Sequence, residues 1–79
     1  MKLLVRNLAR TMAEHEIRVL FSEHGEVAQC NLVLDQETGL SKGFAFVEMP
    51  NDDEAKQAIS ALNQTTVAKS KIRVKRAEG

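Results

Sequence analysis

The feature that most constrains the fold of this chain is a strict alternation of side chains over residues 43–49. Phe44, Phe46 and Glu48 occupy every second position, and Ala45, Val47 and Met49 fill the positions between them. Successive side chains of a β-strand point to opposite faces of the sheet, so a period of two predicts a strand. One set must face a core, and the other must face away from it.

Other segments place this strand in a larger pattern. Mostly apolar or alternating runs predict further strands at 2–6, 27–34 and 71–75, and apolar residues at helical spacing predict helices at 12–24 and 52–62. The order is β-α-β-β-α-β. Right-handed crossovers then place both helices on one face of a four-stranded antiparallel sheet, a ferredoxin-like α+β fold. With 79 residues, the chain has room for a single domain.

Polar residues and a glycine mark where the two helices should begin and end. Thr11, followed three residues later by Glu14, predicts a capping box at the start of the first helix. Gly25 is expected to end that helix in the left-handed conformation. The second helix is expected to begin after Asn51 and to stop at Asn63, another residue that tolerates this conformation.

The charged residues are expected to separate onto two sides of the molecule. The chain holds 11 basic and 11 acidic residues, a formal net charge of zero. The parity of the strands nevertheless places six cations and one carboxylate on the open sheet face, and the helices are mainly acidic. The residues expected on this face are Lys2, Leu4, Arg6, Lys42, Phe44, Phe46, Glu48, Lys71, Arg73 and Lys75. An alternative is that the strand lysines only protect the sheet edges.

Two of the three phenylalanines, Phe44 and Phe46, are expected on this open face. Exposed rings among cations form a stacking platform for nucleic-acid bases, and stacking contributes about 1 to 3 kcal/mol per base. The alternative register would bury both rings, expose Ala45, Val47 and Met49, and turn polar side chains inward. The first arrangement is favoured because the second leaves three apolar side chains in water.

Two segments resemble the signatures of the RNA recognition motif. Lys42–Met49 is similar to its octapeptide and Leu3–Leu8 to its hexapeptide, and the likeness runs from about Lys2 to Ala77. The resemblance implies that the strands carrying the two signatures are central in the sheet. The chain is similar to small single-motif RNA-binding proteins of bacteria, although an excised module would look alike. We therefore expect one motif over 1–79 and a cytoplasmic protein.

The resemblance also implies roles for individual side chains. A ring at the place of Phe46 stacks on a base, one at the place of Phe44 packs against sugars, and a cation at the place of Lys42 meets a phosphate. Leu4 stands where the family usually has a second aromatic ring. Leucine offers no π-face, so we expect binding weaker by about 1 kcal/mol than on a fully aromatic sheet.

Other side chains are placed to reach phosphates or base edges, although single surface residues of these types are often only solvated. Arg76 stands at the chain exit toward Glu78, where the family's chain often runs over RNA. The complete set of candidate RNA-binding residues is Lys2, Leu4, Arg6, Gln29, Asn31, Lys42, Phe44, Phe46, Arg73, Lys75 and Arg76.

No residues resemble a catalytic or metal centre. His15 and His24 are nine positions apart, which places them on opposite sides of one helix. His24 falls on the apolar stripe and is expected to be packed there. Cys30 alternates with outward residues, so we expect a buried thiol rather than a nucleophile. We expect no enzyme activity, no cofactor and no bound metal.

The expected partner is single-stranded RNA, with single-stranded DNA left open. No apolar run approaches the roughly 18 residues that a membrane span needs, so no membrane contact is expected. We expect a monomer. The rival function is a protein-binding variant of the same fold, which would use the acidic helices or a pocket at the sheet edge.

Overall fold

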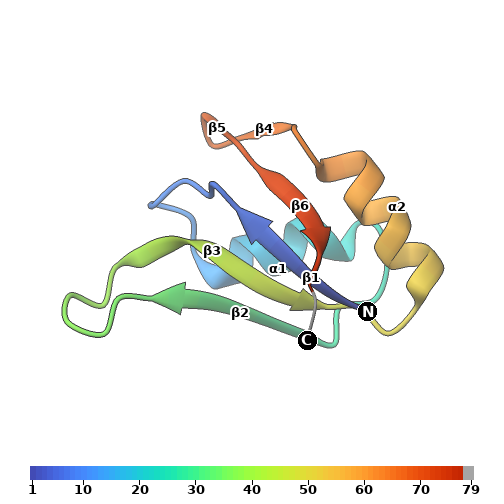
Figure 1. The fold of residues 1–79 in the computed structure, drawn as a ribbon, viewed down its shortest axis with the longest axis horizontal. Coiled ribbons are helices and arrows are strands. Elements are labelled where there is room, and N and C mark those ends of the chain that lie inside the picture. The colour runs from blue at the N-terminus through green and yellow to red at the C-terminus, as the bar shows by residue number, and fades with distance from the viewer. Residues whose placement is uncertain (78–79) are drawn as a thin grey trace.

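The computed structural model describes residues 1–77 and contains one main sheet and two helices (Figure 1). The four strands of this sheet are antiparallel and lie in the order β2-β3-β1-β6. The predicted order of elements is confirmed, with a short extra hairpin ahead of the last strand. The elements are β1 (Lys2–Arg6), α1 (Glu14–Ser22), β2 (Gln29–Leu34), β3 (Ser41–Glu48), α2 (Asp52–Leu62), β4 (Thr66–Val67), β5 (Ser70–Lys71) and β6 (Arg73–Arg76).

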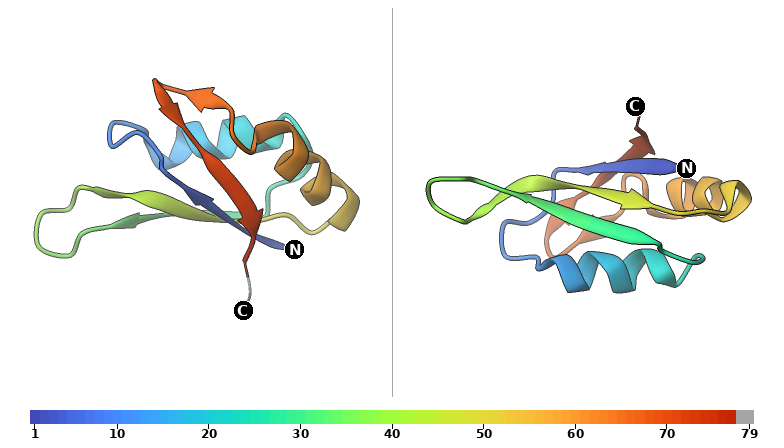
Figure 2. Two further views of the ribbon diagram at one scale, coloured as in Figure 1. Left: turned by 45° about the horizontal axis from the view of Figure 1, so that its top comes forward. Right: turned by 90° about the horizontal axis from the view of Figure 1, so that it is seen from below.

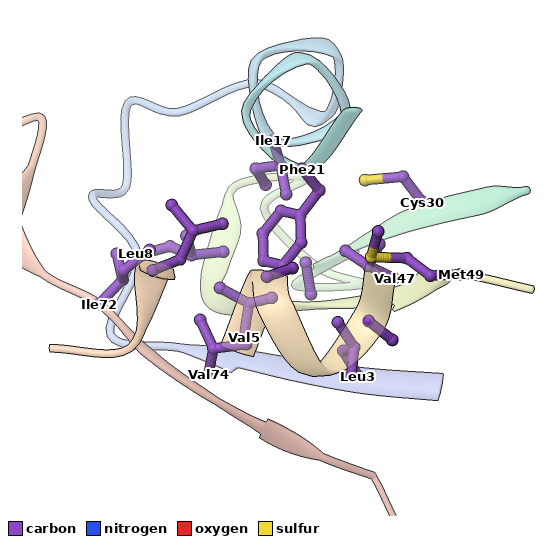
Figure 3. Close-up of a cluster of buried hydrophobic side chains, with 14 of the residues drawn as sticks. Leu3, Val5, Leu8, Ile17, Phe21, Cys30, Val47, Met49, Ile72 and Val74 are labelled. Carbon is purple, nitrogen blue, oxygen red and sulfur yellow. The ribbon is translucent and has the colours of Figure 1, made fainter. Parts of the chain in front are cut away.

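Both helices cover the same face of the sheet, and Figure 2 shows α1 lying along it. The core between the layers joins Ile17 and Phe21 of α1 and Ala55, Ala58 and Leu62 of α2 to Leu3, Val5, Ala45, Val47 and Val74 of the sheet. In Figure 3 the ring of Phe21 points from α1 into the middle of this cluster. Within residues 1–77, no helix covers the other face of the sheet. No helix within residues 1–77 is long and apolar enough to cross a membrane.

The predicted parity of β1 and β3 is confirmed. Ala45, Val47 and Met49 are fully buried, whereas Phe44 and Phe46 stay half-buried on the opposite face. The alternative register is therefore wrong. The strand ends differ slightly from the prediction, because β2 begins two residues later than 27 and β3 spans 41–48 rather than 43–49.

The first helix begins later than predicted, and the capping box at Thr11 is wrong. Its N-cap is Ala13, whose backbone N–H donates to Oε1 of Glu16 at 3.0 Å. The Glu14 carboxylate is used elsewhere, because its Oε2 accepts from the backbone N–H of Leu32 in β2 at 2.9 Å. A tertiary hydrogen bond thus removes Glu14 from capping, and Glu16 takes over that role.

Gly25 does not end the first helix in a left-handed conformation. The helix ends at Ser22, and Gly25 is not among the residues with positive φ. A Cβ at Gly25 would lie 2.5 Å from the Cβ of Glu54 at the start of α2. The Glu54 carboxylate also accepts from the backbone N–H of Glu26 at 3.1 Å. Close approach of the α2 start, rather than φ, explains this glycine.

The second helix has the predicted bounds. The Asn51 side chain accepts from the backbone N–H of Glu54 at 3.0 Å, so it caps α2 as expected. At the other end the prediction fails by one residue: Asn63 has φ −61° and Gln64 has the positive φ of 66°. The Asn63 side chain accepts from the backbone N–H of Val74 instead, which ties the helix end to β6.

The segment after α2 contains a hairpin that the sequence did not predict. Strands β4 and β5 pair through Thr66–Lys71 and Val67–Ser70, and the turn residues Ala68 and Lys69 have φ of 50° and 68°. Two consecutive positive φ values are typical of a type I′ turn, which usually carries Asn or Gly. As a consequence, Lys71 lies in this hairpin and not in the main sheet, so its placement on the open face is wrong.

Candidate nucleic-acid interface

The side chains that point away from the helices form three rows across the main sheet, and we call this surface the open face. Strand register defines the first row as Gln29, Glu48 and Lys2, and the second as Asn31, Phe46, Leu4 and Lys75. Continuing the register by one residue pair places Phe44, Arg6 and Arg73 in the third row. Eight of the ten side chains expected on this face therefore share one surface with Gln29 and Asn31.

The rings of Phe44 and Phe46 contact each other edge to face. Their centroids are 6.2 Å apart and their planes cross at 87°. A planar base can lie parallel to only one of two perpendicular rings. The pair therefore offers one stacking surface and one ring edge, which fits a base on one ring and a sugar beside the other.

Lys2 contacts the ring that the resemblance assigns to base stacking. Its Nζ lies 4.7 Å from the centroid of the Phe46 ring, within the range of a cation–π interaction. The ammonium covers part of the ring surface that a base would use. Stacking on this side of Phe46 therefore requires Lys2 to move, and it leaves a cation beside the stacked base.

Leu4 occupies the centre of the open face between the cross-strand partners Phe46 and Lys75. It is half-buried, in contrast to its fully buried neighbours Leu3 and Val5. The structure thus places an aliphatic side chain beside the Phe46 ring, at the position where the resemblance implies a second aromatic ring. The site gains apolar surface there but no second π-face.

The open face is positive and the helical side is acidic. The open face carries one acidic side chain, Glu48, and five basic ones. This is one cation fewer than predicted, because Lys71 lies in the β4–β5 hairpin. The five basic residues are Lys2, Arg6, Lys42, Arg73 and Lys75. The first turn of each helix is acidic. Within residues 1–77, the ion pairs are those of the N-terminal amino group with Glu48 and Asp52, each at 3.6 Å. The cations of the open face are therefore not neutralised by carboxylates of the described chain.

A basic pocket of about 530 Å³ lies at the Phe44 end of the open face. It is lined by the predicted residues Arg6, Lys42, Phe44 and Arg73, and also by Arg10, which the sequence reading did not include. Arg10 lies in the loop between β1 and α1, where no periodicity indicates which side a residue faces. Its proximity to the site follows only from the folded chain.

The remaining candidates separate into two groups. Gln29 and Asn31 are exposed on β2 and belong to the open face, as predicted. Arg76 is exposed. It pairs with Leu3, whose side chain points to the helix-covered face, so the Arg76 side chain belongs to that face as well. The structure therefore does not bring Arg76 to the open face. The expected exit over RNA extends to Glu78, which lies outside the described residues.

Cys30 is buried, as predicted. Burial raises the pKa of its thiol, and the nearby Glu14 carboxylate adds to this effect. A thiol that holds its proton is a poor nucleophile. His24 is half-buried rather than part of the core, and within residues 1–77 no three His, Cys, Asp or Glu side chains group as metal ligands.

Asp35 shapes the loop between β2 and β3. Its Oδ1 accepts from the backbone N–H groups of Glu37 and Thr38 at 2.8 and 3.1 Å, which lowers the pKa of the carboxyl group below its usual value. This is a turn in which the side chain satisfies backbone donors. The carboxylate thus has a local structural role and lies away from the rings.

Comparisons with known proteins agree with this geometry. The family model of the RNA recognition motif matches residues 3–73. The flowering time control protein FCA of rice is 41% identical over 99% of this chain, and the chloroplastic RNA-binding protein CP31B of Arabidopsis thaliana is 40% identical over 98%. The chain spans 11% and 27% of the length of these two relatives. Such plant relatives give no support to the expected bacterial type.

Solved structures share both the fold and part of the sequence. A crystal structure of RNA binding protein PG1 superposes with a TM-score of 0.95 at 35% identity, covering 98% of this chain and 93% of that one. A Sex-lethal protein/RNA complex gives a TM-score of 0.94 at 32% identity, covering 99% of this chain and 47% of that one. The predicted ferredoxin-like fold is therefore confirmed.

Proposed function

The chain belongs to the RNA recognition motif family, and we propose that it binds single-stranded RNA on the open face of its sheet. One observation carries this proposal: Phe44 and Phe46 stay half-buried on the uncovered side of β3, among cations without carboxylate partners in the described chain. Rings and cations together match the two faces of a nucleotide, its base and its phosphate. The Sex-lethal structure is a complex with RNA, which supports the same partner class.

Binding would proceed by stacking and by neutralisation of phosphates. A base stacks on Phe46 as Lys2 moves aside, a sugar packs against Phe44, and Lys42 meets a phosphate. We expect the face to bind about two to four nucleotides. Because Leu4 supplies no second ring, we expect micromolar rather than nanomolar affinity.

Other functions have less support. A protein-binding variant would leave the open face unused, and the two rings speak against it. One chloroplastic relative is named an RNA-binding protein and another a ribonucleoprotein, which supports a binding module rather than an enzyme. Single-stranded DNA is part of the test, because bases stack whichever sugar carries them.

The test is a titration of a random single-stranded RNA pool with the full chain. The double variant Phe44→Ala/Phe46→Ala should lose most of the binding, because each stacked base contributes about 1 to 3 kcal/mol. A charge reversal on the acidic side, Asp53→Lys, is the matched control and should leave affinity unchanged within about twofold, because Asp53 lies on the exposed start of α2. Equal affinity of wild type and the double variant would refute the proposal. A parallel titration with DNA of the same sequence separates the two nucleic acids.

Several finer predictions belong to the same proposal. We expect a monomer without bound metal, with residues 1–79 acting as one motif in the cytoplasm. Light scattering coupled to gel filtration, with and without RNA, measures the mass of the particle and tests the first of these. The bacterial single-motif type also stays a prediction.

A further inference from the structure

The basic pocket at the Phe44 end has an unusual chemical lining, and we call it the Arg10 pocket. Four cationic side chains line it, from β1, the β1–α1 loop, β3 and β6: Arg6, Arg10, Lys42 and Arg73. Among residues 1–77, none of those that line it carries a carboxylate. Its volume of about 530 Å³ lies within the range of about 300 to 1,000 Å³ that is common for small-molecule sites.

Arg10 is held in this pocket by the backbone of β3. Its Nη1 donates to the backbone oxygen of Ser41 at 3.2 Å. Gly43 makes room for it, since a Cβ there would lie 2.8 Å from the Arg10 Nε, and Gly43 also has a φ of +85°. One of the five guanidinium N–H donors is used in this hydrogen bond, so the others remain available to a ligand.

The neighbouring backbone supports the same arrangement. The backbone N–H of Leu8 donates to the Gly43 oxygen at 2.8 Å, which ties the start of the loop to β3. Asn7 adopts a φ of 59°, and its Nδ2 donates to the Lys71 oxygen at 2.7 Å. The start of the β1–α1 loop is therefore fixed to β3 and to β5, and Arg10 is fixed by its own hydrogen bond to Ser41.

The pocket also continues along the sheet. Two smaller hollows of about 280 and 270 Å³ share Arg73 with it, and Lys71 and Lys75 line one each. The two residues thus extend the positive surface from the pocket toward β6. Lys71 is not on the open face, but the β4–β5 hairpin places it near the Arg10 pocket.

We propose that the Arg10 pocket binds a phosphate group of the RNA strand and that Arg10 is one of its ligands. Guanidinium groups bind phosphate oxygens in pairs of parallel hydrogen bonds, and four cations without a carboxylate favour an anion. The ring of Phe44 forms one wall, so the nucleotide that carries this phosphate lies next to the stacked pair. The proposal rests on RNA binding at the open face. The phosphate could be an internal diester or the terminal phosphate of the strand.

The test compares two arginines that are anchored alike on opposite sides of the molecule. Arg18 on α1 also donates through Nη1 to a backbone oxygen, that of Val27 at 3.3 Å, but it lies away from the open face. Arg10→Gln should weaken binding of an eight-nucleotide RNA about tenfold in dilute salt. It should also lower the slope of log affinity against log salt by about 0.7, the value for one phosphate contact on a single strand. Arg18→Gln should leave both unchanged.

Three versions of the same RNA locate the phosphate: hydroxyl ends, a 5′-phosphate and a 3′-phosphate. Equal losses on all three support an internal diester, and a loss confined to one phosphorylated strand supports a terminal phosphate. Arg10→Lys keeps the charge and should keep most of the salt slope. Thermal melting of each variant shows whether the fold is intact. If Arg10→Gln is unstable, Arg10→Lys should still weaken binding, because an ammonium cannot form the paired hydrogen bonds of a guanidinium.

Different results would refute the pocket proposal and the proposed RNA binding. If Arg10→Gln matches wild type in affinity and salt slope on all three strands, the pocket proposal is wrong, even where Phe44→Ala/Phe46→Ala abolishes binding. The same holds if Arg18→Gln weakens binding as much as Arg10→Gln, because net charge would then explain both. If wild type binds none of the strands, RNA binding itself fails.

Discussion

The two faces of strand β3 differ in burial, chemistry and consequence, although their residues alternate along one segment. Ala45 and Val47 are fully buried against the helices, and Ser41 at the start of the strand is the buried polar residue on the same side. Phe44 and Phe46 lie on the other face with one edge-to-face contact and a lysine above one ring. The buried face uses small apolar residues, and the open face uses the two large rings.

The two faces of β3 therefore differ in what they contribute: the buried face to stability, and the open face, as we propose, to binding. A chain of 79 residues has a free energy of unfolding of about 4 to 12 kcal/mol, and the buried face supplies the apolar contacts behind it. The rings of the open face are not needed for that core. They keep apolar surface in water, and exposed apolar surface of this kind is typical of binding sites.

The largest expected effect is on the free energy of unfolding, when one ring on each face of the sheet is replaced. Phe21→Ala should reduce the free energy of unfolding by about 3 to 5 kcal/mol, because it leaves a cavity in the middle of the core. Phe46→Ala should reduce it by about 1 kcal/mol, because it removes an edge contact and a cation–π contact at a half-exposed site. Urea unfolding measures both values. Similar losses for both variants would show that the open-face ring is a core residue after all.

The face to which each β3 side chain points was predictable from the sequence, because side chains alternate along a strand with a fixed period of two. Once Val47 is assigned to the core, the positions of Phe44 and Phe46 follow without further information. The bounds of α2 were equally predictable, because the Asn51 cap and the apolar spacing agree. The helix-covered core and the outward placement of the two rings thus follow from local patterns.

Features that depend on contacts distant in sequence were not predictable. Glu14 caps nothing because β2 recruits its carboxylate, and Gly25 is needed because α2 comes close. The turn at Ala68 and Lys69 uses a positive φ in residues that rarely adopt it. Each position is decided by a partner far away in the chain or by the closing of the hairpin.

The same limit explains why part of the candidate site was missed. Arg10 joins the site through the Ser41 oxygen and the space beside Gly43, and neither contact leaves a periodic signal in the loop. Lys71 was assigned to the open face because alternation around Ile72 continues through the hairpin into β6. Alternation alone does not show where one strand ends and the next begins.

A second prediction adds a ring to each face. Leu4→Tyr should strengthen RNA binding by about 1 kcal/mol, because it places a π-face beside Phe46 in the same cross-strand row. Val5→Tyr, one residue along the strand, should instead destabilise the fold by about 1 to 3 kcal/mol, because Val5 is fully buried and the core has no space for a ring. Fluorescence titration and urea unfolding measure the two effects. Weaker binding by Leu4→Tyr would mean that Leu4 contacts RNA in another way.

The smallest expected effect is a pH dependence of stability caused by Cys30. It tests whether buried and exposed side chains alternate along β2 as they do along β3. Its raised pKa means that the folded state holds the thiol proton more tightly than the unfolded chain does. Stability is therefore full below the ordinary thiol pKa of about 8.5 and falls as the pH rises above it. Urea unfolding from pH 7 to 10 should show this fall in wild type and less of it in Cys30→Ala.

Thiol labelling supplies the comparison between the two faces of β2. Iodoacetamide should react slowly with Cys30 in the folded protein, because the thiol is buried and protonated. In the variant Cys30→Ala/Asn31→Cys, the thiol moves to the exposed neighbouring position, and it should react at the rate of a free cysteine. Equal rates at the two positions would show that β2 does not separate a buried face from an open one, and the assignment of Gln29 and Asn31 to the open face would then lose its basis.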